Sequence, residues 1–409
     1  MVFFKLAWRN LFRNRGRTLV STTAIAIGFA AMIFYHGIFY GMKNNMYRTA
    51  TESFLGDAQI HREGYRSSRK TEDLINRFPA VTDSLENEEM VKNYSPRVYS
   101  YAMISSPVNV NSVQLIGVDP AMERNLSTID EHIREGEYLP DREGNGIVIG
   151  VKLAEILRLE VGDAAVVTVS EAHTGDLSQA LCRVSGIFDT GDRSMNRGMA
   201  FIGIDRSREM LALGESCHEI AVDFTSIEYG LDRSLFFWDK YSRYGNQALS
   251  WQDLAPQLVS AFAMSENIIS FVGLIMFVLV AFVILNTIFM SLYERTFEFG
   301  VLLAQGTRSL QMGRLIVMES LSLAVIGVIA GSALGLLVTL LFGEIGLGLG
   351  SEGVEFLNVT VTTDIYPVLE AEPFIKYSAG FMICTFLISL YPAFHAARLT
   401  PARALSKEL

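Results

Sequence analysis

The sequence predicts an α-helical membrane protein with four transmembrane helices, cytoplasmic N and C termini, and a large extracytoplasmic α+β domain between helices 1 and 2. Three observations lead to this fold class. Half of the 409 residues are hydrophobic, only 19% are charged, and the mean hydropathy is +0.28. Four long segments are nearly free of charge, whereas residues 43–267 have the mixed composition of a globular domain. Basic residues are also distributed unequally among the connecting segments.

The four apolar segments are long enough to cross a bilayer. A hydrocarbon core about 30 Å thick requires about 20 apolar residues in a helix. The segments that meet this requirement are residues 18–42, 268–292, 315–342 and 377–397. A cleaved signal peptide is the alternative for the first segment, but its apolar stretch exceeds the roughly 7–15 residues of a signal peptide and no A-x-A-like cleavage site follows. We therefore expect a permanent anchor.

Basic residues set the orientation of these spans. Lys and Arg without any acidic residue precede the first span, and residues 293–314 contain Arg295, Arg308 and Arg314. Residues 343–376 instead form a short acidic segment. Because cytoplasmic segments are enriched in Lys and Arg, we expect residues 293–314 and the tail 398–409 to be cytoplasmic. The acidic segment and residues 43–267 then lie outside the cytoplasm.

Residues 1–17 have the pattern of an amphipathic helix in the cytoplasmic interface of the membrane. Apolar side chains share one helical face and basic side chains share the other. The apolar face consists of Phe4, Ala7, Trp8 and Leu11, and the basic face of Lys5, Arg9 and Arg13.

Residues 43–267 have the patterns of both strands and helices. Alternating apolar residues predict short strands, whereas a period of three to four predicts helices. The predicted strands cover residues 113–118, 146–149, 164–169, 181–188 and 199–204, and the predicted helices cover residues 151–159, 206–212 and 253–263. We therefore expect an α+β domain with helical stems that lead from the first span and into the second.

Catalytic and metal-binding patterns are missing from the sequence. A net charge of −10 argues against a nucleic-acid partner, and the histidines and cysteines lack the spacing of metal ligands. Cys182 and Cys217 could pair in an oxidising compartment, but unpaired buried cysteines are the commoner case. We interpret Cys217-His218-Glu219 as ordinary surface residues, because adjacent residues on a strand point to opposite faces.

Two polar turns are candidate docking sites for another protein. Residues 173–179 are expected to form the tip of a hairpin, and residues 189–198 follow a predicted strand. Most turns of this kind are plain solvated connections, so this remains the less favoured interpretation.

The spans have a packing motif and lack charges at mid-membrane depth. Gly327, Gly331 and Gly335 recur at four-residue intervals, so they share one helix face on which another helix can pack closely. Ion pumps and proton-coupled carriers need ionisable groups inside the membrane, and their absence argues against an ionic pathway. Pro392 is expected to kink or end the fourth span.

Several sequence motifs together resemble one known family, the MacB/FtsX-like (type VII) ABC transporter permeases. They are KLAWRNLFRNRGRT (5–18), GVDP (117–120), EGEYL (135–139), GIVIGVKLAEILRLEVGD (146–163), RVSGIFDTG (183–191), YERTFEFGVLLAQGTRSLQMGRLIVMES (293–320) and YPAFHAARLTPARALSKEL (391–409). The arrangement of one span, a large outer domain and three further spans is also similar.

This resemblance implies a subunit without catalytic residues that works in the inner membrane with partners. The chain has no G-x-x-x-x-G-K-[ST] phosphate loop, so no cofactor is expected to bind directly. ATP and Mg would act through two copies of a cytoplasmic ABC ATPase subunit, beside a second permease chain, the same or homologous. The expected ATPase-coupling residues are Glu294, Arg295, Phe297, Glu298, Phe299, Gly300, Val301 and Leu302.

Within this family, the chain looks most similar to the LolC/LolE-like lipoprotein-releasing permeases. That branch implies extraction of lipoproteins from the outer leaflet of the inner membrane and a periplasmic protein partner. The candidate contacts for a lipid or lipoprotein substrate are Phe34, Ile38, Met42, Phe262, Ile268 and Phe271. Two alternatives stay open: MacB-like efflux of an amphiphilic small molecule or peptide, and FtsX-like signalling to a cell-wall hydrolase.

Overall fold

The computed structural model describes residues 9, 15–140, 142–348, 354–356, 359–361 and 364–398. The predicted amphipathic helix therefore lies mostly outside the described residues, as does the tail after Arg398. The chain divides into two compact units. The membrane unit comprises Met1–Asn44, Phe262–Ser351 and Thr363–Leu409, and the outer unit comprises Asn45–Ala261 and Glu352–Thr362.

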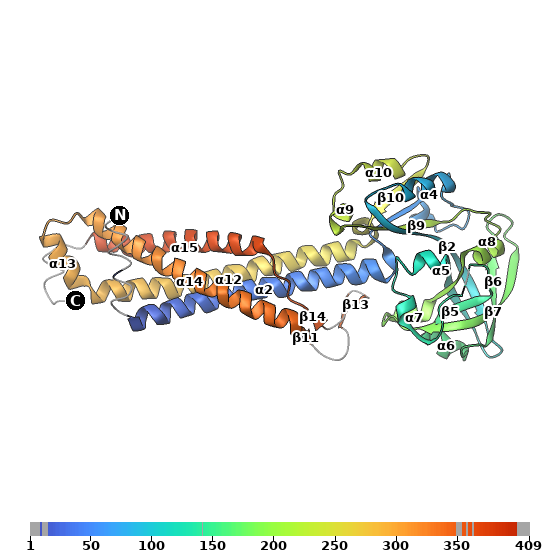
Figure 1. The fold of residues 1–409 in the computed structure, drawn as a ribbon, viewed down its shortest axis with the longest axis horizontal. Helices are drawn as coiled ribbons and strands as arrows, with labels where there is room; N and C mark the ends of the chain where they lie inside the picture. Colours follow the sequence, from blue (N-terminus) through green and yellow to red (C-terminus); the bar gives the residue numbers. More distant parts are fainter. Residues whose placement is uncertain are drawn as a thin grey trace. The chain divides into compact units, whose positions relative to one another are not determined.

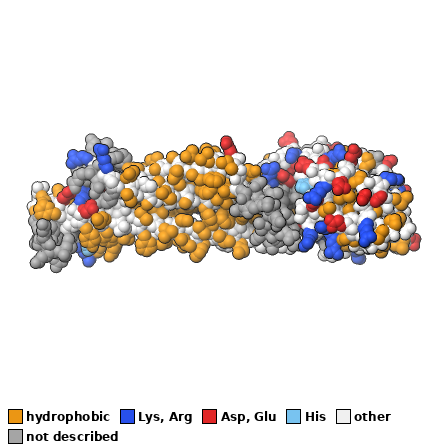
Figure 2. Space-filling view, turned by 90° about the horizontal axis from the view of Figure 1, so that it is seen from below, with side chains coloured by type: hydrophobic (Ala, Val, Ile, Leu, Met, Phe, Trp, Pro, Cys, Tyr) orange, Lys and Arg blue, Asp and Glu red, His pale blue; other side chains and the backbone are white. Residues whose placement is uncertain are grey.

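Within the described residues, four helices are long and apolar enough to cross a membrane. They are α2 (Arg15–Ala50), α12 (Pro256–Glu294), α14 (Ser309–Ile345) and α15 (Ala371–Ala397), and the short helix α13 (Thr296–Ala304) follows α12 (Figure 1). Hydrophobic side chains cover the face of the membrane unit seen in Figure 2. Such a surface is suited to contact with lipid chains.

Helices α2 and α12 are longer than the predicted spans 18–42 and 268–292. This difference corresponds to the helical stems expected at the two ends of the outer domain. Pro392, in contrast, does not end its helix, because α15 continues to Ala397. Pro392, Ala393 and Ala396 are buried, and packing against neighbouring helices allows a proline inside a membrane helix.

The outer unit is built around a sheet of ten strands. Their order is β10-β1-β9-β2-β3-β8-β5-β7-β4, and β6 pairs with β2 and β7. The strands are β1 (Ala58–Arg62), β2 (Val91–Ser105), β3 (Val110–Val118), β4 (Ile133–Gly136), β5 (Gly146–Gly150), β6 (Ala164–Ser170), β7 (Leu177–Phe188), β8 (Met199–Gly203), β9 (Glu219–Phe224) and β10 (Asn246–Ser250). All pairs are antiparallel except β3–β8 and β5–β7.

Short helices surround this sheet. They are η1 (Thr51–Leu55, a π-helix), α3 (Tyr65–Ser68), α4 (Phe78–Glu86), α5 (Pro120–Glu123), η2 (Asp130–His132), α6 (Val151–Leu157), α7 (Arg193–Gly198), α8 (Ile204–Leu211), α9 (Ile227–Leu231), α10 (Phe236–Tyr241) and α11 (Trp251–Leu254). Two short ribbons follow α14: β11 (Leu347–Gly348) with β14 (Asp364–Ile365), and β12 (Val354–Phe356) with β13 (Val359–Val361).

The five predicted strands coincide with β3, β5, β6, β7 and β8. The predicted helix 253–263 is divided instead, because α11 ends at Leu254 and α12 begins with Pro256, a residue suited to the first turn of a helix. Residues 173–179 form the tip of the β6–β7 hairpin as expected. Residues 189–198 are not a plain turn, since they contain α7, whose first amides donate hydrogen bonds to the Asp192 carboxylate.

Candidate functional site

The connection between α12 and α14 lies at the predicted cytoplasmic end of the membrane unit. Arg295 lies between α12 and α13, and its guanidinium group forms ion pairs with one carboxylate of α13 and one of α14. Its Nε donates to Glu298 Oε2 at 3.1 Å, and its Nη1 donates to Glu319 Oε2 on α14 at 3.0 Å. The side chains of Arg295 and Glu319 are only 11% and 13% exposed. This nearly buried ion pair fixes the start of α13 against α14.

Helix α13 presents two different faces. Phe299 is 2% exposed and packs in the core of the helix bundle, whereas Phe297 is 62% exposed. Gly300 is also buried, and Leu302 packs partly against the same core. Phe299, one of the expected ATPase-coupling residues, therefore does not offer its ring to a partner, because packing in the bundle buries it. Phe297 remains the accessible aromatic residue of this helix, next to the exposed Glu294.

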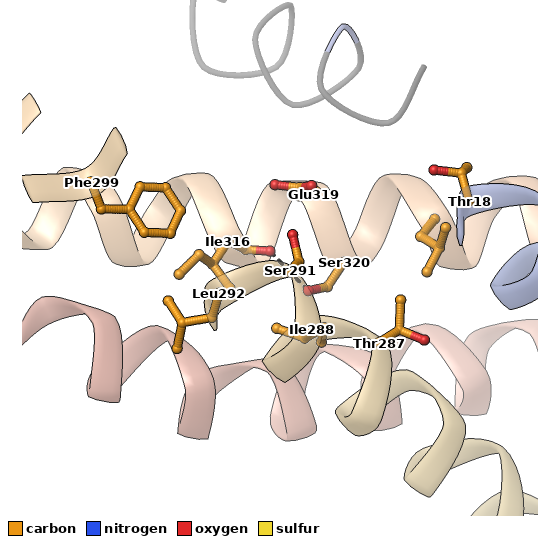
Figure 3. Close-up of a pocket in the computed structure, with 10 residues that line it drawn as sticks. Thr18, Thr287, Ile288, Ser291, Leu292, Phe299, Ile316, Glu319 and Ser320 are labelled. Carbon is orange, nitrogen blue, oxygen red and sulfur yellow. Dashed lines mark hydrogen bonds between the residues drawn. The ribbon is translucent and has the colours of Figure 1, made fainter. Parts of the chain in front are cut away.

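A small cavity of about 30 Å³, lined by both polar and apolar side chains, lies beside this connection (Figure 3). Three helices and α13 contribute to it: Thr18 comes from α2, Ser291 from α12, and Glu319 and Ser320 from α14. A cavity of this size holds a water molecule when polar groups line it. Hydroxyls and one carboxylate thus lie close together where α13 joins the bundle.

The glycines of α14 lie against α2. A methyl group added at Gly327 would stand 2.4 Å from Ile25 Cγ2, and one added at Gly331 would stand 2.8 Å from the carbonyl oxygen of Ala26. At Gly335 the nearest atom, Ile33 Cβ, would be 3.2 Å away. The absence of side chains at these glycines allows the two helices to approach closely.

The six candidate substrate contacts have unlike surroundings. Phe34 packs against Phe342 of α14, with ring centroids 5.4 Å apart. Phe262 is 7% exposed, so its ring is buried, and Lys43 Nζ lies 5.7 Å from its centroid. Phe271 and Ile268 are exposed, whereas Ile38 and Met42 are half-buried. Of the six, Phe271 and Ile268 on α12 have the surface that a lipid chain could contact.

A buried charged cluster in the outer unit escaped the sequence analysis. Arg97 on β2 is fully buried and donates two hydrogen bonds to Glu123 of α5, at 2.6 and 3.1 Å. Its Nη1 donates to Glu219 of β9 at 3.0 Å and to the carbonyl oxygen of Phe54 in η1 at 2.6 Å. His61 Nε2 lies 3.1 Å from the other Glu219 oxygen. Arg97 therefore connects the π-helix that follows α2 to the centre of the sheet.

This cluster holds Glu219 in its ionised form. Burial alone would raise the pKa of Glu219, but its hydrogen bond with His61 and the charge of Arg97 outweigh burial and lower the pKa to about 2. The surface interpretation of Cys217-His218-Glu219 was wrong, since all three side chains are buried. Residue 219 begins β9, whose two edges pair with β1 and β2 and whose residues are buried on both faces of the sheet.

Cys182 and Cys217 do not pair. Both thiols are free and buried, and the Cys217 thiol donates to the carbonyl oxygen of Glu219 at 3.3 Å. Burial raises the pKa of Cys182 to about 11, which keeps that thiol protonated and unreactive. Within the described part of the chain, no group of three or more His, Cys, Asp or Glu side chains could hold a metal ion.

Fold and site together define a multi-pass membrane protein whose α+β domain is inserted between its first two membrane helices. Two family descriptions match this chain. The MacB-like periplasmic core domain matches residues 18–227, and the FtsX-like permease C-terminal region matches residues 270–401. The chain therefore belongs to the MacB/FtsX-like family of ABC transporter permeases. It is an inner-membrane permease subunit with a periplasmic domain, and the two matched family descriptions are of a periplasmic domain and a permease region.

Two relatives with low sequence identity align with almost the whole of this chain, and one solved structure aligns with about half of it. The lipoprotein-releasing system transmembrane protein LolE of Haemophilus influenzae is 22% identical over 98% of this chain and 99% of its own length. LolC of the same organism is 21% identical over 98% of this chain and 97% of its own length. The periplasmic region of MacB from Actinobacillus actinomycetemcomitans is 11% identical, with a TM-score of 0.36, over 52% of this chain and 95% of that structure.

Proposed function

We propose that this permease extracts lipoproteins from the outer leaflet of the inner membrane and releases them, driven by ATP hydrolysis in a separate subunit. The observation that carries this proposal is the extent of the similarity to LolE and LolC, which covers almost the whole of both relatives. At this level of identity the similarity supports the kind of cargo and not a particular lipoprotein.

The connection at α13 supports the coupling part of the proposal. Phe297 and Glu294 are exposed for a partner, and the Arg295–Glu319 ion pair joins α13 to α14. A force applied to α13 by an ATPase would therefore act on a membrane helix through a nearly buried contact. Two ATPase copies, which bind ATP and Mg, and a second permease chain complete the proposed complex.

The β6–β7 hairpin tip is the candidate contact for a periplasmic partner.

The substrate contacts of the proposal lie on α12. Phe271 and Ile268 are exposed apolar residues, and an acyl chain that is already inside the membrane would contact them through van der Waals packing, without a hydrophobic driving force. Phe34, Ile38 and Met42 on α2 are partly covered and would contribute after a movement of the helices. Phe262 contributes through the packing of α12 and not through direct contact.

A MacB-like exporter of amphiphilic molecules is the second candidate. It is favoured by the match of residues 18–227 to the MacB-like periplasmic core domain. The two candidates differ in cargo: an exporter binds a small amphiphile, whereas a lipoprotein-releasing permease needs a protein with attached acyl chains.

The test is the ATPase activity of the reconstituted complex. This chain, its cognate ATPase and its partner permease are placed in proteoliposomes with a triacylated protein or the same protein without acyl chains. We expect only the acylated form to stimulate ATP hydrolysis, at least twofold. Stimulation by a small amphiphile and not by the acylated protein would favour the exporter.

A further inference from the structure

A second cavity, of about 360 Å³, lies in the membrane unit at the predicted periplasmic ends of α2, α12 and α15. Its volume is within the range of small-ligand sites. Unlike the apolar surface around it, the cavity is lined by charged and aromatic side chains, among them His36, Lys43, Glu372, Lys376 and Tyr377.

The charges of this cavity are only partly neutralised. Lys43 Nζ lies 2.8 Å from Glu266 Oε1, so this pair is satisfied. Glu372 and Lys376 are one turn apart on α15, the spacing at which such residues commonly pair. Among the described residues, however, neither has an ion-pair partner within 4.0 Å, although both line the cavity. Glu370 adds a further carboxylate to the wall.

Aromatic rings form another part of the wall. His36 Nδ1 and the Tyr377 hydroxyl are 3.0 Å apart, which joins α2 to α15. The rings of His36 and Tyr40 are stacked, with centroids 6.2 Å apart. Aromatic faces beside carboxylates attract ammonium groups, whereas a lysine attracts phosphate.

We propose that this cavity binds the headgroup of a zwitterionic phospholipid, phosphatidylethanolamine in the first instance. The ammonium group would lie against Glu372 and the aromatic wall, and the phosphate against Lys376. Exposed apolar residues of the same helices, Phe271 on α12 and Ile375 on α15, offer a surface for its acyl chains. An acylated protein terminus has no ammonium–phosphate pair, so the headgroup site is specific for a lipid, although Phe271 is also a proposed contact for the acyl chains of the cargo.

The test is lipid binding to the full chain in detergent micelles, measured by native mass spectrometry. Phosphatidylethanolamine and phosphatidylglycerol with identical acyl chains are compared, because the second lipid has the phosphate but no ammonium group. We expect at least fivefold stronger binding of phosphatidylethanolamine. Lys376→Gln should weaken binding of both lipids, and Glu372→Gln should abolish the preference. Glu344→Gln, an exposed carboxylate that does not line the cavity, is the matched control and should change neither.

Three outcomes would overturn the proposal. The first is equal binding of the two lipids by the unaltered chain. The second is an equal effect of Glu344→Gln and Glu372→Gln, which would show a general loss of negative charge and no site. The third is displacement of the lipid by soluble phosphoethanolamine at a similar concentration, because the occupant would then be a soluble molecule.

Discussion

Arg295 is the residue through which the exposed helix α13 is joined to the membrane bundle. Its ion pair with Glu319 is nearly buried, whereas Glu298, its other partner, is 41% exposed. Exposed ion pairs contribute about 0–1 kcal/mol, but removal of one partner from a buried pair leaves an uncompensated charge and costs more. The ion pairs of Arg295 with Glu319 and with Glu298 therefore contribute different amounts to the stability of the membrane unit.

Replacement of Glu319 by Gln should lower the stability of the membrane unit by about 2 kcal/mol, since Arg295 loses its buried counter-ion. Glu298→Gln is the matched control and should cost less than about 1 kcal/mol. Denaturant titration of the full chain in detergent measures both. Equal losses in the two variants would show that the Arg295–Glu319 contact has no special importance.

His218 makes the outer unit sensitive to mild acid. Its Nδ1 accepts a hydrogen bond from the Tyr99 amide, and its Nε2 lies 2.9 Å from the carbonyl oxygen of Thr71. Burial lowers the pKa of His218, so the folded protein keeps the ring neutral while the unfolded chain takes up a proton below about pH 6.5. Stability should therefore be complete above pH 6.5 and decrease as the pH falls toward the lowered pKa.

His218→Gln should make the melting temperature less dependent on pH between 7.5 and 5.5, because Gln offers the same acceptor and donor without a titrating group. Tryptophan fluorescence measures this, since Trp238 and Trp251 are both buried in the outer unit. A Trp8→Phe background removes the third tryptophan. If the melting temperature of His218→Gln depends on pH as strongly as that of the unaltered protein, another titrating group causes this dependence.

Single residues could be predicted from the sequence more readily than the side-chain contacts between them. Arg295 was predicted to be a coupling residue, but its contact with Glu319 depends on how α13 folds back against α14. Arg97, Glu123 and Glu219 come from distant strands and helices, and no local pattern connects them. Only the buried position of β9 explains why Glu219, which looked like a surface residue, is part of the core.

At the scale of elements, α2 and α14 approach each other closely at Gly327, Gly331 and Gly335. Glycine has a low helix propensity, and its replacement by alanine inside a helix usually stabilises by about 1 kcal/mol. At Gly331 the added methyl group would overlap the backbone of α2, so steric repulsion outweighs this gain.

Gly331→Ala should therefore destabilise the bundle by about 1–3 kcal/mol. Gly273→Ala on α12 is the control, because its added methyl group would be 3.6 Å from the flexible end of Met32, an ordinary contact. That variant should be neutral or more stable. Thermal unfolding in detergent compares the two, and a stable Gly331→Ala protein would contradict the close packing.

Strands with regular alternation, such as β3 and β6, could be predicted, whereas β2 and β9 could not. β2 contains Pro96 and several polar residues and is buried on both faces along much of its length, so it lacks a period of two. Pro392 was expected to kink or end the fourth span, but α15 continues to Ala397, where the predicted span also ends. The sequence shows that Pro392 cannot donate a hydrogen bond, but not that neighbouring helices support the chain around it.

At the scale of the whole molecule, hydropathy and charge already specified four spans and an outer domain, and the family membership agrees with both. The cargo could not be read from the sequence in this way. Acyl chains are recognised by apolar side chains, and these are common to every lipid-facing helix, so neither Phe271 nor Ile268 distinguishes a substrate from bulk lipid.

The most direct test of the account is ATP-dependent release of a lipoprotein from proteoliposomes that contain this chain, its partner permease and the cognate ATPase. The amount of triacylated protein transferred to a soluble acceptor is compared with that of the same protein anchored by a single transmembrane helix. The account predicts release of the acylated protein only, and only with hydrolysable ATP. Hydrolysis without any release of acylated protein would contradict it.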